Sequence, residues 1–107
     1  MGVIYFFNLQ EFIDIFNLNI FIESGTGEGD GIDYAIRFSF KKIYSIEYID
    51  EVAKRAKERF PDERVRIIEG DSSTWFRRFL PLLQGDNILF WRSEEHTSEL
   101  QSPSVIS

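Results

Sequence analysis

The stretch that decides the fold is Phe21-Ile22-Glu23-Ser24-Gly25-Thr26-Gly27-Glu28-Gly29. Its beginning, with Ile20 before it, is a short apolar run that is typical of a buried strand ending at Glu23. A glycine-rich turn follows up to residue 31, and apolar residues then recur at helical spacing over residues 32–40. A strand, a glycine-rich turn and a helix in this order are typical of the first unit of a ligand-binding α/β fold.

The alternation of strand and helix continues on both sides of this stretch. Helical spacing over residues 9–16 precedes it, and further helices are predicted over residues 49–60 and 72–83. Strands are predicted at residues 43–46, 65–68 and 88–91. Pro61 ends one helix, Pro81 should distort the last turn of the next, and Ser72 or Ser73 can cap the start of that helix.

Four strands that alternate with helices predict right-handed crossovers and a parallel sheet with helices on both faces. The expected fold class is therefore α/β, a truncated Rossmann-like sheet that occupies residues 1–91. Such sheets bind ligands at the carboxyl ends of their strands, and those ends carry Glu23, Glu47 and Asp71. With only these strands, the fourth one would form an exposed apolar edge.

The composition excludes several classes of function. The chain has 12 basic and 18 acidic residues, so neither nucleic acid nor an anionic membrane is an expected partner. It has no cysteine and a single histidine, His96, and we therefore predict no disulfide and no metal site. We find no membrane-spanning stretch and no signal peptide, and we expect a cytoplasmic protein. The oligomeric state is not indicated.

Three classes of ligand compete for the glycine loop. A Walker-type phosphate loop requires Gly-Lys-Ser/Thr, but no lysine precedes Lys41. A dinucleotide loop requires Gly-x-Gly-x-x-Gly, and the third glycine, counted from Gly25, would fall at Asp30. The segment 23–31 carries acids and no basic residue, which opposes a pyrophosphate. S-adenosylmethionine suits this charge because its sulfonium and ammonium groups are cationic.

Taken with these motifs, residues from about Leu9 to Trp91 resemble the N-terminal half of a class I S-adenosylmethionine-dependent methyltransferase. The resemblance rests on the glycine-loop stretch, on Ile43-Tyr44-Ser45-Ile46-Glu47, on Gly70-Asp71-Ser72 and on Phe90-Trp91. It implies S-adenosylmethionine as the cofactor and transfer of a methyl group to an unknown acceptor. The catalytic residues are also unknown, because the family places such groups beyond the fourth strand.

The resemblance assigns a role to each residue of the site. Glu23 would hold the ammonium group of the methionine, and Glu47 would accept hydrogen bonds from both ribose hydroxyls. Asp71 would accept from the adenine amino group with the backbone of Ser72 nearby, and Tyr48 or Trp75 could pack against the adenine. The glycines of the loop would line the methionine and ribose, and two neighbours complete the cofactor-binding set: Gly25, Gly27 and Gly29, with Ser24 and Thr26.

Two alternatives stay open. The first is an NAD(P)-dependent oxidoreductase, because Glu47 lies 22 residues after Gly25, a spacing that also suits the ribose-binding acid of a dehydrogenase. The second is a non-catalytic, methyltransferase-like binding module. Glycine spacing and loop charge favour the methyltransferase over the first alternative.

The last 16 residues differ in kind from the rest. Arg92 to Ser102 resemble the in-frame translation of a common short-read sequencing adapter, and Ile106-Ser107 fit its continuation. We therefore expect residues 92–107 to be a non-native, disordered tail, and the natural sequence to be known only through Trp91. Without the tail, 11 basic and 15 acidic residues remain, for a net charge of −4. We expect the chain by itself to bind the cofactor weakly at most and to lack transferase activity.

Overall fold

The computed structural model describes residues 8–83, 85–92 and 104–106. At its centre lies one sheet with the strand order β3-β2-β1-β4-β5. The strands are β1 (Ile20–Ser24), β2 (Lys42–Glu47), β3 (Val65–Glu69), β4 (Ile88–Arg92) and β5 (Ser104–Ile106). The first four run parallel to one another, and β5 pairs with β4 in the antiparallel sense. The prediction of a four-stranded parallel sheet with alternating helices is confirmed.

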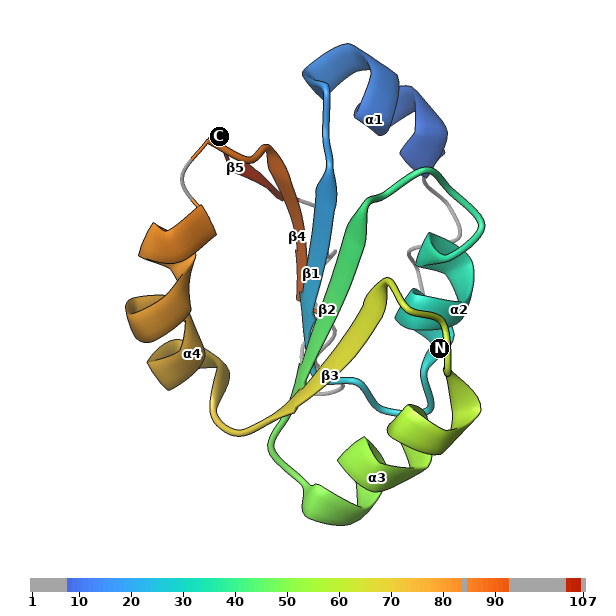
Figure 1. Cartoon of the computed structure of the whole chain (residues 1–107), viewed down its shortest axis with the longest axis vertical. Helices are drawn as coiled ribbons and strands as arrows, with labels where there is room; N and C mark the ends of the chain where they lie inside the picture. Colours follow the sequence, from blue (N-terminus) through green and yellow to red (C-terminus); the bar gives the residue numbers. More distant parts are fainter. Residues whose placement is uncertain (1–7, 84, 93–103, 107) are drawn as a thin grey trace, which may run out of the picture.

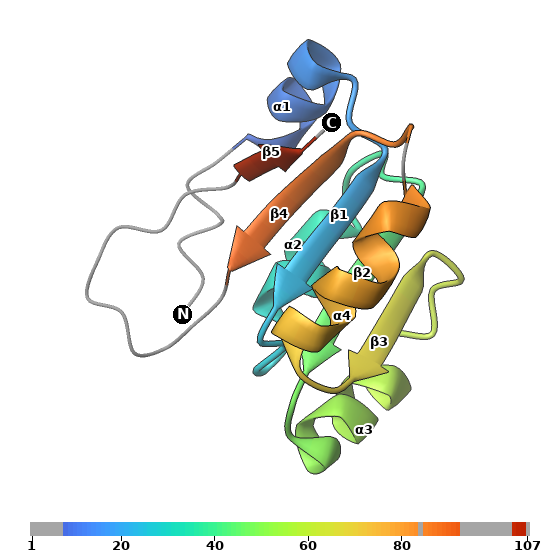
Figure 2. The same ribbon diagram turned by 90° about the vertical axis from the view of Figure 1, so that its left-hand side faces the viewer.

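Helices cover both faces of the sheet, as Figures 1 and 2 show. One face carries α1 (Leu9–Phe16), α2 (Asp30–Ala35) and α3 (Asp50–Arg59), and the other carries α4 (Ser72–Phe79) followed by the 3₁₀ turn η2 (Leu80–Leu83). Alternate strand residues point to opposite faces, so Phe21 and Ile43 join the core beneath α1 to α3, whereas Ile22 and Ile46 join the core beneath α4.

The start of the central strand is fixed by two asparagines. The Asn19 side-chain oxygen accepts the backbone N–H of Asn87 at 2.7 Å, and the Asn87 carbonyl accepts the N–H of Asn19 at 3.0 Å. On the other side, the Asn19 carbonyl accepts the N–H of Lys41 at 2.8 Å. These contacts set the beginning of β1 level with those of β2 and β4.

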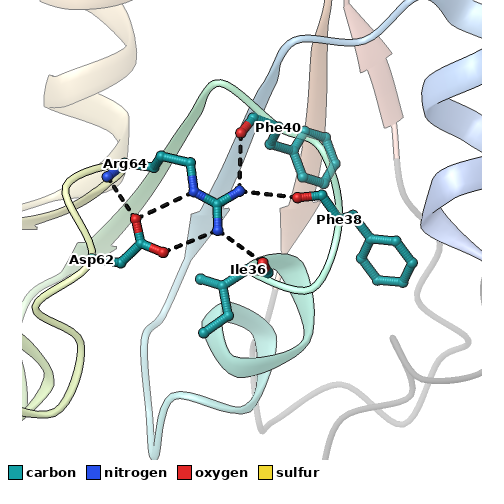
Figure 3. Close-up of polar contacts among 5 residues, drawn as sticks. All are labelled: Ile36, Phe38, Phe40, Asp62 and Arg64. Atoms are coloured by element: carbon teal, nitrogen blue, oxygen red, sulfur yellow. Dashed lines mark hydrogen bonds and ion pairs between the residues drawn. The ribbon is translucent and has the colours of Figure 1, made fainter.

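Helix α2 is shorter than its apolar spacing predicts, because it ends at Ala35 instead of continuing to Phe40. Beyond that end, the guanidinium of Arg64, the residue before β3, donates to the carbonyls of Ile36, Phe38 and Phe40 at 2.8, 2.9 and 3.1 Å (Figure 3). The Asp62 carboxylate accepts from the same guanidinium at 3.2 and 3.0 Å. One side chain thus supplies hydrogen bonds to three carbonyls past the end of α2 and stabilises the non-helical path of residues 36–40.

The start of α4 also differs from the sequence-based expectation. Its N-cap is Asp71, whose side-chain oxygen accepts the backbone N–H of Thr74 at 3.0 Å, and Ser72 is already the first helical residue. Aspartate and serine both serve as N-caps, so propensity alone does not distinguish them. The predicted distortion at Pro81 is observed, because α4 tightens into η2 over Leu80–Leu83.

The fourth strand is not an open edge along its whole length, and the prediction that it would be is wrong. Ile88, Leu89 and Phe90 lie opposite Ile106, Val105 and Ser104 of β5. An edge strand offers unpaired N–H and C=O groups that any suitable extended segment can satisfy. The expected disorder of the tail therefore describes neither Arg92, the last residue of β4, nor Ser104–Ile106, and residues 93–103 and 107 lie outside the described residues.

No helix within the described residues is long and apolar enough to cross a membrane.

Candidate functional site

The carboxyl ends of the first three strands meet at one edge of the sheet. The turn after β1 is attached to β2 by a hydrogen bond from the Gly25 N–H to the Ile46 carbonyl at 2.8 Å. The turn after β3 is attached to β2 by a hydrogen bond from the Gly70 N–H to the Glu47 carbonyl at 2.9 Å. Glu23, Glu47 and Asp71 thus follow neighbouring strands at this edge.

The glycine loop uses the conformational freedom of its glycines. Gly25, Gly27 and Gly29 have φ of 83°, 55° and 94°, values that side chains disfavour. The N–H of Gly29 donates to the Thr26 carbonyl at 2.9 Å and closes a turn. A Cβ on Gly27 would meet no atom within 4 Å, so the backbone there is open to a ligand.

Gly29 is packed rather than open. A Cβ at this position would lie 2.6 Å from the ring of Phe60, the residue that follows α3. The neighbouring Arg59 donates to the Glu28 carbonyl, and its guanidinium lies 4.8 Å from the Phe60 ring centroid. The end of α3 therefore supports one side of the loop, and the predicted role of Gly29 in lining the ribose stays a prediction.

Thr26 attaches the loop to the core. Its hydroxyl lies 2.6 Å from that of Ser45 in β2, and both side chains are buried. Ser45 is also opposite Glu23 in the strand register. The Thr26 side chain therefore faces inward, and only the backbone of this residue is left to meet a ligand.

Glu47 holds the loop from the end of β2. One of its carboxylate oxygens accepts the N–H of Gly27 at 3.2 Å, and the other accepts the N–H of Ile49 at 3.0 Å. The residue is 7% exposed. Each carboxylate oxygen can accept more than one hydrogen bond, so Glu47 keeps the capacity that ribose hydroxyls would use.

Glu23 is the most unusual residue of the site. It is fully buried, and within the described part of the chain neither carboxylate oxygen has a hydrogen-bond partner. The carboxylate lies against Gly31 in the first turn of α2, where a Cβ would come within 2.8 Å of Oε2. The adjacent Ser24 hydroxyl is likewise buried without a partner among the described residues. A buried carboxyl in this state binds either a proton or a cationic group.

Burial is the main cause that raises the pKa of Glu23 well above its ordinary value. The nearby hydroxyl of Ser45 lowers the pKa although it is bonded to Thr26 and lies outside hydrogen-bond geometry with the carboxylate, while the negative charges of Glu47 and Asp30 raise the pKa further. Glu47 and Asp30 therefore both repel the ionised form of Glu23. A cation bound between them would reverse the effect of this repulsion.

The residues that were predicted to contact the adenine differ in how accessible they are. Asp71 uses Oδ2 to accept from the backbone N–H and the hydroxyl of Thr74 at 3.0 and 3.2 Å. Tyr48 is 81% exposed beside the loop, which leaves it accessible to a ligand. Trp75, in α4, is buried against Tyr44, with ring centroids 5.9 Å apart, in the core on the α4 face of the sheet. Of the two aromatic candidates, Tyr48 is the one beside the carboxyl edge.

Sequence reasoning missed the cations near the loop. A cavity of about 500 Å³ lies between the loop and α3, and Gly27, Glu28, Arg55 and Arg59 contribute to its lining. The loop segment has no basic residue of its own, but α3 supplies two. The acidic charge of the loop therefore argues less strongly against a dinucleotide than the sequence alone suggests. The glycine spacing becomes the main reason to prefer S-adenosylmethionine.

Comparison with known proteins gives a fold. No family model and no curated protein matches the chain. Solved structures do match, including a dimethyladenosine transferase from Plasmodium falciparum, with 16% identity, a TM-score of 0.51 and 81% of this chain covered. A provisionally named S-adenosyl-L-methionine-dependent methyltransferase from Methanococcus maripaludis matches with 17% identity, a TM-score of 0.52 and 78% of this chain covered.

The chain has a Rossmann-like methyltransferase fold. It spans 41% and 52% of these two chains. Part of a pyruvate kinase from Cryptosporidium parvum also matches, with 16% identity, a TM-score of 0.58, and coverage of 91% of this chain and 21% of that one. At such low sequence identity, the similarity shows a shared fold only. The activity must therefore be inferred from the residues of the site.

Proposed function

We propose that this chain is the cofactor-binding part of an S-adenosylmethionine-dependent methyltransferase. The observation that carries the proposal is the buried carboxyl of Glu23, which lacks a partner among the described residues at the end of the first strand. A buried carboxylate gains most from a cation, and the ammonium of a methionine moiety is one. The open backbone at Gly27 and the spare acceptor capacity of Glu47 support the same ligand.

The residues present fit this cofactor in chemical type. Glu23 would bind the ammonium, Glu47 would accept from the ribose hydroxyls, and Asp71 would accept from the adenine amino group through Oδ1. When bound, the cofactor supplies an electrophilic methyl group on its sulfonium sulfur. The chain's own contribution is to fix the orientation of that group at the sheet edge, since proximity and orientation are large terms in a group transfer. The methyl acceptor is not indicated.

Binding experiments test the proposal with three ligands. Saturation-transfer NMR detects weak binding. It should show that S-adenosylhomocysteine binds and that NAD⁺ does not. Methylthioadenosine, which lacks the amino-acid portion, should bind more weakly than S-adenosylhomocysteine. Preferential binding of NAD⁺ would support the oxidoreductase instead, and equal binding of methylthioadenosine and S-adenosylhomocysteine would contradict a role for the methionine ammonium.

Substitutions locate the site. Glu23→Gln should remove the preference for S-adenosylhomocysteine over methylthioadenosine, because the amide cannot form an ion pair with the ammonium. Glu58→Gln, at an exposed position of α3, is the matched control and should keep the preference. A preference that survives in Glu23→Gln would show that Glu23 does not hold the ammonium.

A further inference from the structure

A second cavity lies on the opposite face of the sheet from α3, along β2 and β3. It has a volume of about 380 Å³, and its lining residues include Tyr44 and Ile68 from the sheet, Trp75 from α4 and Leu83 from η2. This volume is within the usual range for small-molecule sites, about 300–1,000 Å³. The cavity faces α4, whereas the glycine loop leads into α2 on the other face of the sheet.

The cavity exists because α4 leaves part of the sheet uncovered. The helix makes ring contacts with β2 and β4, through Trp75 with Tyr44 at 5.9 Å and through Phe76 with Phe90 at 4.9 Å. Strand β3 is the edge of the sheet, and α3 packs on its other face. Apolar side chains of β3 and η2 are therefore left partly exposed, and Leu82 at the mouth is 75% exposed.

Two cations stand at the rim of this apolar cavity. Tyr44 and Arg66 are directly opposite each other across β2 and β3, and Lys42 is on the same face two residues before Tyr44. Within the described part of the chain, neither the Lys42 ammonium nor the Arg66 guanidinium has a carboxylate partner. The whole chain has a net charge of −6, so two cations beside one apolar cavity are a local reversal of its charge.

We propose that this cavity binds a small amphiphilic carboxylate, with the apolar part against Tyr44, Trp75 and Leu83 and the carboxylate between Lys42 and Arg66. An apolar lining with a few polar groups that converge at one end is the usual construction of a small-ligand site. The planar guanidinium of Arg66 can take a carboxylate through two parallel hydrogen bonds, and the Lys42 ammonium adds a point charge. The proposal does not depend on the proposed cofactor or on the glycine loop.

Three probes of equal chain length test the role of charge: octanoate, octanol and octylamine. Octanoate should quench or shift the fluorescence of Trp75, octanol should do so more weakly, and octylamine should not bind. The response should disappear in Trp75→Phe, which leaves Trp91 as the remaining tryptophan in the core. Equal binding of octanol and octanoate would overturn the proposal, since it would leave the two cations without a role.

Charge removal at the rim supplies the second test. The double variant Lys42→Gln/Arg66→Gln should weaken octanoate binding by about fivefold to thirtyfold, as expected for two partly exposed ion pairs. Lys41→Gln is the matched control, because Lys41 is an exposed neighbour that does not line the cavity, and it should bind octanoate normally. An unchanged affinity of the double variant for octanoate would overturn the proposal. Binding of the native chain to anionic vesicles that octanoate fails to displace would also overturn it, because the surface would then recognise a bilayer.

Discussion

The hydroxyl of Thr26 lies 2.6 Å from that of Ser45, and this buried hydrogen bond joins the glycine loop to the middle of β2. Removing either hydroxyl leaves the other buried without its partner, which costs about 1–3 kcal/mol. We expect Ser45→Ala and Thr26→Val each to lower the free energy of unfolding by about that amount. The double variant should cost less than the sum of the two, as urea denaturation would measure, and simple additivity would show that the hydrogen bond has no net value.

The effect of Gly31→Ala on the free energy of unfolding should change sign when Glu23 is also replaced. In the native chain, Gly31→Ala places a methyl group against the Glu23 carboxylate and should destabilise by about 1–3 kcal/mol. In a Glu23→Ala background the carboxylate is absent, and alanine should stabilise α2 by up to about 1 kcal/mol because of its higher helix propensity. Equal effects of Gly31→Ala in both backgrounds, measured by denaturant unfolding, would exclude the contact.

Burial of Glu23 predicts a specific dependence of stability on pH. Its pKa is raised in the folded state above the ordinary value of 4.5, so the folded protein retains a proton that the unfolded chain releases. The associated stability is complete below the unfolded pKa and is lost as the pH rises through the folded pKa. As the pH rises above the ordinary pKa of 4.5, the free energy of unfolding of Glu23→Gln relative to the native chain should therefore increase.

The same ionisation links pH to the proposed cofactor. A cationic ammonium requires the ionised form of Glu23, so binding should release a proton and the affinity for S-adenosylhomocysteine should rise with pH. Binding enthalpies measured in two buffers of different ionisation enthalpy reveal the proton release. Glu23→Gln should bind without it, and an identical proton count in both proteins would assign the release to another group.

Arg64 should be the most sensitive arginine of the described residues. Its guanidinium serves three backbone carbonyls and the Asp62 carboxylate at once (Figure 3). A lysine carries three donors on one nitrogen and cannot span these acceptors, so Arg64→Lys should cost about 2 kcal/mol in unfolding free energy. Arg78→Lys, on the exposed surface of α4, is the control and should stay within about 0.5 kcal/mol of the native value.

Substitution of Asn19 tests the alignment of the strands. Asn19→Ala removes the side-chain acceptor of the Asn87 N–H and the donor to Asp86 at 2.9 Å. We expect a loss of about 1–3 kcal/mol in thermal or denaturant unfolding. Asn17→Ala, two residues earlier, should destabilise for a different reason, since Asn17 is the C-cap of α1 with φ of 54°.

The strands and most helices could be predicted because their signals are local. The apolar runs at Ile20 and Ile43 differ clearly from the helical spacing of residues 50–59, and Pro61 defines where that helix ends. The end of α2 could not be predicted in this way. The path beyond it is stabilised by Arg64, nearly 30 residues later in the chain, and no local pattern shows that a distant guanidinium will take the carbonyls of Ile36 and Phe38.

In the candidate site, too, some features follow from the local sequence and others depend on tertiary packing. Its acids and glycines are visible in the sequence because their spacing follows from the strand ends and the turn. The burial of Glu23 beneath Gly31 depends on how α2 packs, and the approach of Arg59 to the loop depends on how α3 packs. In the sequence, Glu23 and Glu47 look equivalent because each comes at the end of a predicted strand. Tertiary packing distinguishes them, since it leaves the Glu23 carboxylate without a hydrogen-bond partner among the described residues and gives Glu47 two backbone donors.

The strand order has a consequence for how the chain is made. Asn19 and Asn87, which align β1 with β4, are 68 residues apart, and β2 completes the opposite side of β1 much earlier. A ribosome therefore delivers β1, β2 and β3 well before β4. Until that strand emerges, the apolar edge of β1 has no parallel neighbour on that side, and loop closure over this distance slows its capture. During synthesis, a chaperone or a second nascent chain competes for the strand that ends up most deeply enclosed.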